Sequence, residues 1–465
     1  MYQYKDMDDT IVAVATPAGV GGIGIVRLSG KQAFAIADKL FVAKNGGLPS
    51  DFKSFSAHYG WVKRSTDNES IDEALLTIFR APKSYTAEDV VEISCHGGQV
   101  PVKAVLSSAI ELGARMAEPG EFTKRAFLNG RIDLVEAEAV LDIITAQTDA
   151  FLRVSTHQLK GELSTEFDGI REQLMNVYTE IEAIVNFPED DIDAAGRRQI
   201  MERISVQYER VEKLLQSSRN GRILKEGIRV VLCGKPNVGK SSLLNALLKQ
   251  QRAIVTDIAG TTRDVIEESA QIKGIPFVLV DTAGILEPRD LIEEEAVKRS
   301  HLYIESADLV LLVLDVSRPI SDEDMLLLDK TKTANVLVVL NKSDLQQVID
   351  EDGLQKLLKG SKTVRVSAME QDSIHTLEST IVDTIWQENE LGAHGIMVSN
   401  IRHINALKAA QISMAGALEI IDQGIALEFA SEEIKSAVNH LDGITGRNID
   451  ADLLERIFSQ FCIGK

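Results

Sequence analysis

The chain has 465 residues, a formal net charge of −20 and 44% hydrophobic residues. This length and composition are typical of a soluble protein with roughly two to four domains. The acidic balance argues against broad, nonspecific nucleic-acid binding, because phosphate contacts need clustered lysine and arginine. It leaves room for a local basic patch, or for a partner that supplies one.

No apolar run reaches the length of a membrane span, and the N-terminal residues do not resemble a signal peptide. The cysteines Cys95, Cys233 and Cys462 lack disulfide or metal spacing. Unpaired cysteines fit a reducing compartment. We therefore expect a cytoplasmic protein that is not associated with a membrane.

Residues 1–120 predict a mixed α/β domain. Strand-like runs are expected at 10–15, 23–28, 74–79 and 90–94, and helices at 31–41 and 100–113. Glycines crowd the strand that leads to Arg27, and another strand ends in His96-Gly97-Gly98. Because the first glycines precede their strand, they do not form a dinucleotide-binding loop. The residues alone indicate a candidate ligand pocket, with ordinary turns as the alternative.

Helical patterns occupy two separate segments, 121–222 and 386–465. In the first, Ile170, Leu174 and Val177 recur at spacings of four and three, which is typical of a packed helix. The acidic stretch at 187–191 is expected to end this helix. Since domain termini often lie close together, we predict one helical domain with residues 223–385 inserted as a separate domain. Two separate helical bundles are the alternative.

The segment from Gly234 to Ser241 fits the pattern G-x-x-x-x-G-K-[ST] of a phosphate-binding loop. An apolar strand at 228–232 precedes it, and a helical pattern follows from Ser242. Glycines let the backbone approach phosphates closely, and a helix N-terminus presents free N–H groups. We expect Lys240 to reach the β- and γ-phosphates of a nucleotide and Ser241 to bind Mg²⁺. A glycine turn before an ordinary helix is the alternative.

Three further elements predict a Ras-like α/β GTPase domain. A buried strand ends in Asp281-Thr282-Ala283-Gly284, whose carboxylate would hold Mg²⁺ through water and whose last N–H would meet the γ-phosphate. Another strand ends in Asn341-Lys342-Ser343-Asp344. The carboxylate of Asp344 would accept hydrogen bonds from guanine, so we expect ATP to be rejected. Ser367-Ala368 follows a third strand and would cover the guanine face.

The loop Thr256-Asp257-Ile258-Ala259-Gly260-Thr261-Thr262 suits a segment that closes on Mg²⁺ and the γ-phosphate. Either Thr261 or Thr262 would bind the metal. Directly after the Asp-x-x-Gly element stands Ile285, where Ras-like GTPases carry a water-orienting glutamine. Hydrolysis must therefore recruit another group. The acidic run 293–295 offers candidates, although such a run is usually a solvated helix face.

The segment 458–465 is aromatic and apolar to its end. Most chain ends are polar and frayed, so we expect this one to be docked, with Cys462 and Lys465 at defined places. Burial is the ordinary fate of a free cysteine. The segment does not fit a prenylation signal.

On these motifs the chain resembles the tRNA modification GTPase family MnmE, also called TrmE, over essentially its whole length. The segments that carry the resemblance are 15–17, 21–30, 96–98, 119–122, 125–129, 257–264 and 461–465. The resemblance implies an N-terminal folate-binding-like domain that forms a homodimer, a helical domain and an inserted G domain.

The same resemblance implies a reaction. With an FAD-dependent partner of the MnmG (GidA) family, in a heterotetramer or larger assembly, such proteins modify certain tRNAs. They add a carboxymethylaminomethyl or aminomethyl group to carbon 5 of the wobble uridine. The one-carbon unit comes from a tetrahydrofolate, such as 5-formyl-tetrahydrofolate. Because this chain is acidic, we expect the flavoprotein to make most of the tRNA contacts.

Residue roles follow from the resemblance as well. Folate contacts map onto Arg27, Glu92, Arg131 and Lys465, and a reactive cysteine maps onto Cys462. Family members hydrolyse GTP when two G domains dimerise around potassium, which can stabilise charge as an arginine finger does. Potassium ligands map onto Asn237, Thr256, Ile258 and Thr261, and magnesium ligands onto Ser241 and Thr262. Glu293 would orient water, and Lys240 is the second expected catalytic residue.

The full set of expected GTP contacts comes from the loop, switch and base-recognition elements together. It comprises Asn237, Val238, Gly239, Lys240, Ser241, Ser242, residues 256–262, residues 281–284, Asn341, Lys342, Asp344, Ser367 and Ala368. Two other functions are open at this level. A ribosome-assembly or signalling GTPase is opposed by the tail and the glycine-rich N-terminal segment. A folate-dependent enzyme with a purely structural GTPase is opposed by the intact metal and base residues.

Overall fold

The structure is a computed structural model, which describes most of the chain. The described residues are 8–186, 194–250, 267–281, 303–304, 306–332, 334–350, 353–354, 358, 361–385 and 396–465. The contacts divide the chain into two compact units. The first contains residues 1–141, 158–171 and 438–465, and the second contains residues 142–157 and 172–437. Among the described residues, no helix is both long and apolar enough to cross a bilayer.

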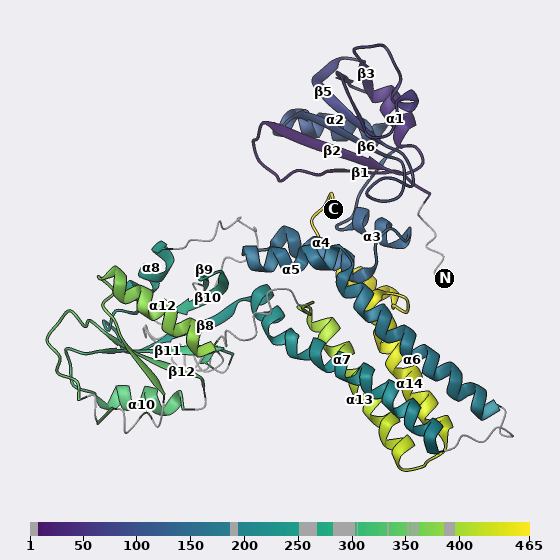
Figure 1. The fold of residues 1–465 in the computed structure, drawn as a ribbon. Helices are drawn as coiled ribbons and strands as arrows, with labels where there is room; N and C mark the ends of the chain where they lie inside the picture. Colours follow the sequence, from purple (N-terminus) through teal and green to yellow (C-terminus); the bar gives the residue numbers. More distant parts are fainter. Residues whose placement is uncertain are drawn as a thin grey trace, which may run out of the picture. The chain divides into compact units, whose positions relative to one another are not determined.

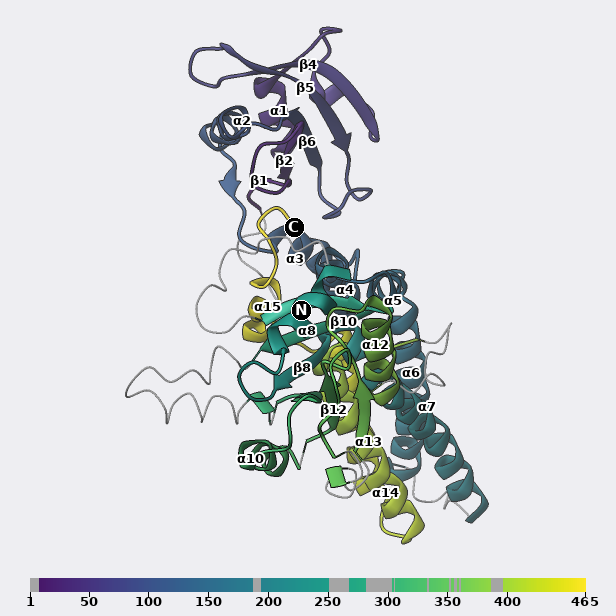
Figure 2. The ribbon, with the colours of Figure 1, turned by 90° about the vertical axis from the view of Figure 1, so that its left-hand side faces the viewer.

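A seven-stranded sheet forms the core of the first unit, with strand order β3-β4-β5-β6-β2-β1-β7. Neighbouring strands are antiparallel, except that β1 pairs with β7 in parallel. The strands are β1 (Ile11–Val14), β2 (Ile23–Ser29), β3 (Phe41–Ala43), β4 (Ser56–Lys63), β5 (Ser70–Phe79), β6 (Val90–His96) and β7 (Arg115–Met116). Helices α1 (Ala33–Leu40) and α2 (Gln99–Glu111) cover one face, where buried aliphatic residues form the core (Figure 2). A short 3-10 helix, η1, spans Pro49–Asp51.

The opposite face of this sheet carries an apolar patch. Val42, Tyr59, Trp61 and Leu75 are all exposed, with 42 to 51% of each side chain accessible. Their registers place Val42 opposite Trp61 and Tyr59 opposite Leu75, so the four form neighbouring cross-strand pairs. We call these four residues the outer-face patch. An apolar cluster of this kind marks an interaction surface more often than a scattered exposed residue does.

Helix α3 (Glu121–Leu128) is attached to the sheet by a buried network of charges. The Arg125 side chain is 3% exposed and pairs with Asp9 at 2.5 Å, Glu121 at 2.9 Å and Glu88 at 3.2 Å. Arg115 holds the same Glu121 carboxylate at 2.6 Å. Burial alone would raise the pKa of Glu121 and Asp9, but their hydrogen bonds to Arg115 and Arg125 outweigh it and keep both pKa values below the usual range.

The helical part of the chain is built from long helices, as the apolar spacing predicts. They are α4 (Leu134–Thr145), α5 (Asp149–Leu159), α6 (Glu162–Asn186), α7 (Ala194–Glu226), α13 (Ile401–Asp422), α14 (Leu427–Thr445) and α15 (Ala451–Phe458). The predicted seam residues Ile170, Leu174 and Val177 are buried on α6. In the second unit α7 and α13 lie along each other (Figure 1).

The second unit also contains a six-stranded sheet of order β13-β12-β11-β8-β10-β9. Its strands are β8 (Ile228–Cys233), β9 (Glu267–Ile272), β10 (Ile275–Asp281), β11 (Leu309–Asp315), β12 (Val336–Asn341) and β13 (Lys362–Arg365), and only β9 runs antiparallel to its neighbour. Helices α8 (Lys240–Gln250) and α12 (Gln371–Ile385) lie on one face and α10 (Asp322–Lys330) on the other (Figure 1). This doubly wound arrangement places ligand sites at the carboxyl ends of the parallel strands. The predicted combination of mixed α/β, helical and P-loop α/β parts is confirmed.

Candidate nucleotide and ligand sites

The predicted phosphate-binding loop connects β8 to α8, as the motif requires. Gly234 has φ +150°, and a Cβ there would lie 2.5 Å from the carbonyl oxygen of Val313. Gly239 has φ +98°, and its Cβ would lie 2.2 Å from Nδ2 of Asn341. Both positions therefore require glycine for backbone conformation and for space. The loop therefore lies against the ends of β11 and β12 and continues directly into α8.

Lys240 is buried at the first position of α8. Its Nζ donates hydrogen bonds to the carbonyl oxygens of Gly234 and Lys235, each at 2.8 Å. The ammonium thus lies against the inside of the loop that is expected to surround phosphates. Ser241 and Ser242 follow it in the first turn of α8, and the N-terminal turn of a helix favours an anion.

The predicted base-recognition residues lie next to this loop. Asn341 is buried, and its Nδ2 donates to the carbonyl oxygen of Val238 at 2.8 Å. Ser343 N donates to the carbonyl oxygen of Val366 at 3.1 Å. This hydrogen bond joins the loop that follows β12 to the loop that follows β13. Ser367 is buried and its N–H donates to Ser373 Oγ at 2.7 Å, while Asp344 and its carboxylate are exposed. The structure therefore brings these predicted guanine contacts to one edge of the sheet.

Asp315 is a member of this site that the sequence analysis missed. It ends β11, and its carboxylate accepts a 2.6 Å ion-pair contact from Lys342 Nζ. The same Nζ donates to the carbonyl oxygen of Asn237 at 2.9 Å. Burial alone would raise the pKa of Asp315, but hydrogen bonds from Lys342 and Ser317 outweigh it and lower that pKa. An acidic residue at the end of an otherwise apolar strand was the signal that could have revealed it.

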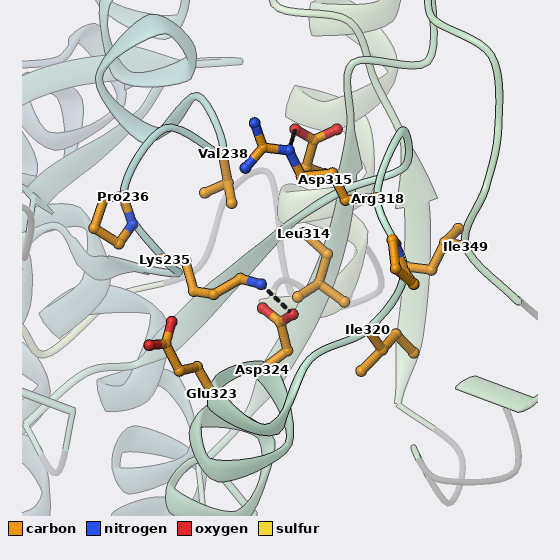
Figure 3. Close-up of a pocket in the computed structure, with 11 residues that line it drawn as sticks. Lys235, Pro236, Val238, Leu314, Asp315, Arg318, Ile320, Glu323, Asp324 and Ile349 are labelled. Carbon is orange, nitrogen blue, oxygen red and sulfur yellow. Dashed lines mark ion pairs between the residues drawn. The ribbon is translucent and has the colours of Figure 1, made fainter.

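A pocket of about 200 Å³ lies beside the loop, between Lys235 and the start of α10 (Figure 3). Lys235 Nζ pairs with Asp324 Oδ2 at 2.6 Å and donates to Ser321 Oγ at 2.8 Å. Ser321 and Asp324 also form the capping box of α10. This pair connects the phosphate-binding loop to α10, so loop and helix are positioned together.

Several predicted site residues lie outside the part of the chain that the structure describes. They are Thr256, Asp257, Ile258, Ala259, Gly260, Thr261, Thr262, Thr282, Ala283, Gly284 and Glu293. Asp281 ends β10, one strand away from β8 at the same edge of the sheet. The predicted magnesium, potassium and water-orienting roles of these residues stay predictions.

The four predicted folate contacts come together in the first unit around a residue that was not predicted, Tyr85. Arg27 Nε pairs with Glu92 Oε1 at 2.7 Å, and both lie in the sheet. The guanidinium carbons of Arg27 and Arg131 lie 5.5 and 5.0 Å from the centroid of the Tyr85 ring. Lys465 Nζ lies 5.8 Å from the same centroid. The aromatic residue in Ser84-Tyr85-Thr86 gave no pattern by which its role could be recognised.

The C-terminal tail is docked against β1, as its apolar character predicts; the chain end lies beside β1 and α3 in both views (Figures 1 and 2). Arg27 Nη1 donates to the carbonyl oxygen of Gly464 at 3.1 Å, and Phe461 is buried. Cys462 is exposed, so the ordinary expectation of burial is wrong for this cysteine. Burial, followed by repulsion from Arg27, lowers the pKa of Lys465, while Glu92 acts in the opposite direction.

Comparison with known proteins decides the family. The family model described as "MnmE helical domain" matches residues 134–462, and the model described as "GTP-binding protein TrmE N-terminus" matches residues 10–131. The tRNA modification GTPase MnmE of Alkaliphilus oremlandii (strain OhILAs) is 42% identical over 459 residues, covering 99% of this chain and 100% of the relative. The chain belongs to the MnmE family.

Other relatives and solved structures are similar to parts or all of this MnmE-family chain. The tRNA modification GTPase MnmE of Bacillus subtilis (strain 168) is 42% identical, over 98% of this chain and 100% of the relative. Among solved structures, the FeoB G-domain from Methanococcus jannaschii is 29% identical, with a TM-score of 0.26. It covers 34% of this chain and 98% of its own.

The described residues fit the ligands expected of an MnmE-family protein. The loop offers a buried ammonium, glycines without room for a Cβ and a helix N-terminus, which together suit the phosphates of GTP. Ser241 supplies a hydroxyl of the kind that Mg²⁺ accepts. In the first unit three cations face one carboxylate around Tyr85. Such a set suits an anionic molecule that also offers a hydrogen-bond donor to Glu92.

Proposed function

We propose that this protein is a potassium-stimulated GTPase that modifies the wobble uridine of certain tRNAs together with an FAD-dependent partner. Family membership carries the coarser statement: the chain is a GTP hydrolase that acts in tRNA modification and uses GTP and Mg²⁺. The observation that carries the finer proposal is the presence of two sites in one chain. The loop with its buried Lys240 and the neighbouring Asn341 support a GTP site, and the cationic pocket around Tyr85 supports a folate site.

The modification itself would be the addition of a carboxymethylaminomethyl or aminomethyl group to carbon 5 of uridine. Its decisive test is mass-spectrometric analysis of wobble nucleosides in tRNA from cells that lack this chain. We expect the modified uridines to disappear and to return when the intact gene is restored. An unchanged nucleoside profile would refute the proposed reaction, whatever the GTPase activity of the purified protein.

Potassium stimulation is proposed because Ile285 replaces the water-orienting glutamine, so another charge-stabilising group is needed. Asn237 supports this assignment: it is exposed in the loop at φ +65°, with its carbonyl held by Lys342. GTP turnover should be much faster in potassium than in sodium at equal ionic strength. Asn237→Ala should remove that difference. Equal rates in the two salts for the unaltered protein would rule the potassium role out.

The one-carbon donor is proposed to be a tetrahydrofolate such as 5-formyl-tetrahydrofolate, bound by Arg27, Glu92, Arg131 and Lys465. The clustering of these residues around Tyr85 supports the assignment. Equilibrium dialysis with 5-formyl-tetrahydrofolate should detect binding, and Arg27→Ala should weaken it. No binding by the unaltered protein would exclude this donor. Cys462 is exposed, and its proposed role as a reactive thiol depends on the same pocket.

The proposed partners are a second copy of the chain, an MnmG-type flavoprotein and tRNA, in a cytoplasmic heterotetramer or larger assembly. The outer-face patch supports pairing of two copies through the N-terminal sheet, because its four exposed apolar side chains form one surface. The net charge of −20 supports tRNA contacts made mainly by the flavoprotein. Tight, salt-sensitive tRNA binding by this chain alone would contradict that division.

A further inference from the structure

Tyr85 is contacted by three cations, which is unusual for one aromatic ring. Arg131 lies 5.0 Å, Arg27 5.5 Å and Lys465 5.8 Å from the ring centroid. Each distance is within the range at which the ring quadrupole attracts a cation. The three residues come from a loop, a strand and the C-terminal tail, so no single element brings the charges together.

Like charges gathered around one ring repel one another, and the described side-chain carboxylates near them, Glu92 and Glu136, number one fewer than the three cations. Glu92 pairs with Arg27 at 2.7 Å. Lys465 Nζ has no hydrogen bond or ion pair with any residue that the structure describes, although the residue is half-buried. The net charge of the Arg27, Arg131, Lys465 and Glu92 side chains together is therefore positive. The Tyr85 ring is the shared neighbour of all three cations.

Tyr85 itself is held from several sides. Its hydroxyl shares a 2.8 Å hydrogen bond with Thr123 Oγ1 on α3, and its carbonyl oxygen accepts from Arg131 Nη1 at 2.8 Å. Asn129 Nδ2 donates to the carbonyl oxygen of Thr86 at 2.7 Å, which fixes the next residue. Burial raises the pKa of the Tyr85 hydroxyl, so the ring stays neutral across the physiological range. The ring is thus a fixed surface rather than a mobile side chain.

We propose that Tyr85 is a positioning residue of the folate site, where its ring gathers Arg27, Arg131 and Lys465 into one cationic wall for an anionic folate. The inference rests on the proposed folate function. The ring acts through the cations that contact the ligand. It determines affinity because a wall assembled beforehand spares the ligand the cost of ordering three long side chains.

Phe122 offers the contrast that separates this role from simple packing. Its ring also lies near Arg27, at 5.6 Å, but it is fully buried and contacts only that one cation among the described residues. Tyr85 is half-buried and contacts all three. A ring needed only to fill space would behave like Phe122, whereas the proposed role depends on the charge distribution of the Tyr85 ring.

The test measures binding of 5-formyl-tetrahydrofolate to the full-length protein by isothermal titration calorimetry. Tyr85→Phe keeps the ring and should bind within about threefold of the unaltered protein. Replacement of Tyr85 by 3,4,5-trifluorophenylalanine keeps the shape but weakens the quadrupole, and should bind about fivefold more weakly than Tyr85→Phe. Tyr85→Leu should bind at least tenfold more weakly. Tyr178→Leu, a half-buried tyrosine of α6, is the matched control and should bind normally.

The outcomes separate two failures. If the unaltered protein binds and Arg27→Ala does not, but the fluorinated variant binds as tightly as Tyr85→Phe, the positioning role of Tyr85 is refuted. If the unaltered protein does not bind, the proposed folate function is refuted first. Should Tyr85→Leu fail to fold by circular dichroism, the fluorinated variant still decides, because its shape closely matches that of the Tyr85→Phe side chain.

Discussion

At the scale of single residues, Asp315 has the clearest unassigned role in the nucleotide site. Its carboxylate holds Lys342, and Lys342 in turn holds the backbone of Asn237 in the loop. The Lys342 ammonium therefore connects the end of β11 to the residue proposed to bind potassium. Because the pair is largely shielded from water, its charge matters more than that of an exposed pair.

We predict that Asp315→Asn weakens GTP binding by about fivefold, which corresponds to about 1 kcal/mol. The amide keeps the shape of the side chain but loses the charge that strengthens its hydrogen bond to Lys342. Fluorescence titration with a GTP analogue carrying an N-methylanthraniloyl group would measure the change. Asp322→Asn, an exposed carboxylate at the start of α10, serves as the control. Equal affinity for both variants would contradict the role of Asp315.

The conformation of the loop from Gly234 to Lys240 could be predicted from sequence, because backbone-driven motifs have fixed spacing. Gly234, Gly239 and Lys240 belong to one contiguous pattern. Asp315 and Tyr85 could not be found in this way. Each acts through contacts with residues far away in the chain, and a single Asp or Tyr between apolar residues has many ordinary explanations.

At the scale of secondary-structure elements, α3 depends on the buried charges of Arg125. Removing Arg125 leaves the Glu88 and Glu121 side chains, which are 15% and 10% exposed, without a charge partner that is itself buried, since Arg115 is 43% exposed. We predict that Arg125→Met destabilises the N-terminal sheet and α3 by about 3 kcal/mol at neutral pH. Hydrogen exchange of peptides from β1 and α3 would measure it. Arg115→Met should cost much less, because the Arg115 side chain is 43% exposed and that of Arg125 only 3%.

The same network predicts a pH dependence with a definite sign. The pKa values of Asp9 and Glu121 are lowered in the folded protein, so the unfolded chain takes up protons first as the pH falls. The stabilisation is complete above the ordinary carboxyl pKa of about 4. It is lost as the pH falls below that value through the lowered pKa values. The cost of Arg125→Met should therefore shrink at pH 3, and a cost that stays constant would contradict this account.

The docked tail is a second element whose position rests on backbone geometry. Gly464 has φ +94°, and a Cβ there would lie 2.4 Å from the carbonyl oxygen of Val14. We predict that Gly464→Ala releases the tail, raises hydrogen exchange in residues 458–465 and weakens 5-formyl-tetrahydrofolate binding, because Lys465 leaves the pocket. Gly424→Ala is the matched control: its φ is +69°, but no atom lies within 4 Å of its Cβ. Unchanged exchange in Gly464→Ala would contradict the predicted release.

Elements with strong apolar periodicity were predicted closely. A very short strand, and a strand with apolar residues on both of its faces, were missed. The expected strands at 10–15, 23–28 and 90–94 correspond to β1, β2 and β6. Strand β4 was not predicted, because its exposed positions carry Tyr59 and Trp61 and so hide the alternation of buried and exposed residues. Strand β3 has three residues, too few for a period to be recognised.

At the scale of the whole molecule, residues that flank the predicted inserted domain 223–385 on either side, Gly221 and Val398, meet in the second unit. A Cβ on Gly221 would lie 2.3 Å from the carbonyl oxygen of Val398, so the backbones of α7 and the segment before α13 are in close contact. Val398 N also donates to Ser217 Oγ at 3.4 Å. Entry and exit points this close allow a domain to be inserted without opening the helices on either side.

The boundary between α7 and the predicted inserted domain is nevertheless crossed by apolar contacts. Ile223 and Leu224 belong to the apolar core beneath the six-stranded sheet, and Phe151 of α5 packs into the same core. These residues explain why the contacts place the G domain and most helices in one unit. The predicted boundaries at 223 and 385 stay a prediction, and removal of the G domain would uncover Phe151.

We predict that the chain still folds when residues 223–396 are replaced by a Gly-Gly-Ser linker. Phe151→Gln is added so that the deletion does not expose an apolar side chain. The contact between Gly221 and Val398 supplies the reason, because a short linker spans ends that already meet. Circular dichroism should show a cooperative, helix-rich melt, and the protein should bind 5-formyl-tetrahydrofolate but not GTP. The same deletion without Phe151→Gln is the control and should aggregate more. A shortened chain that unfolds or precipitates in both forms would show that the helices need the G domain, and that the insertion is not an independent domain.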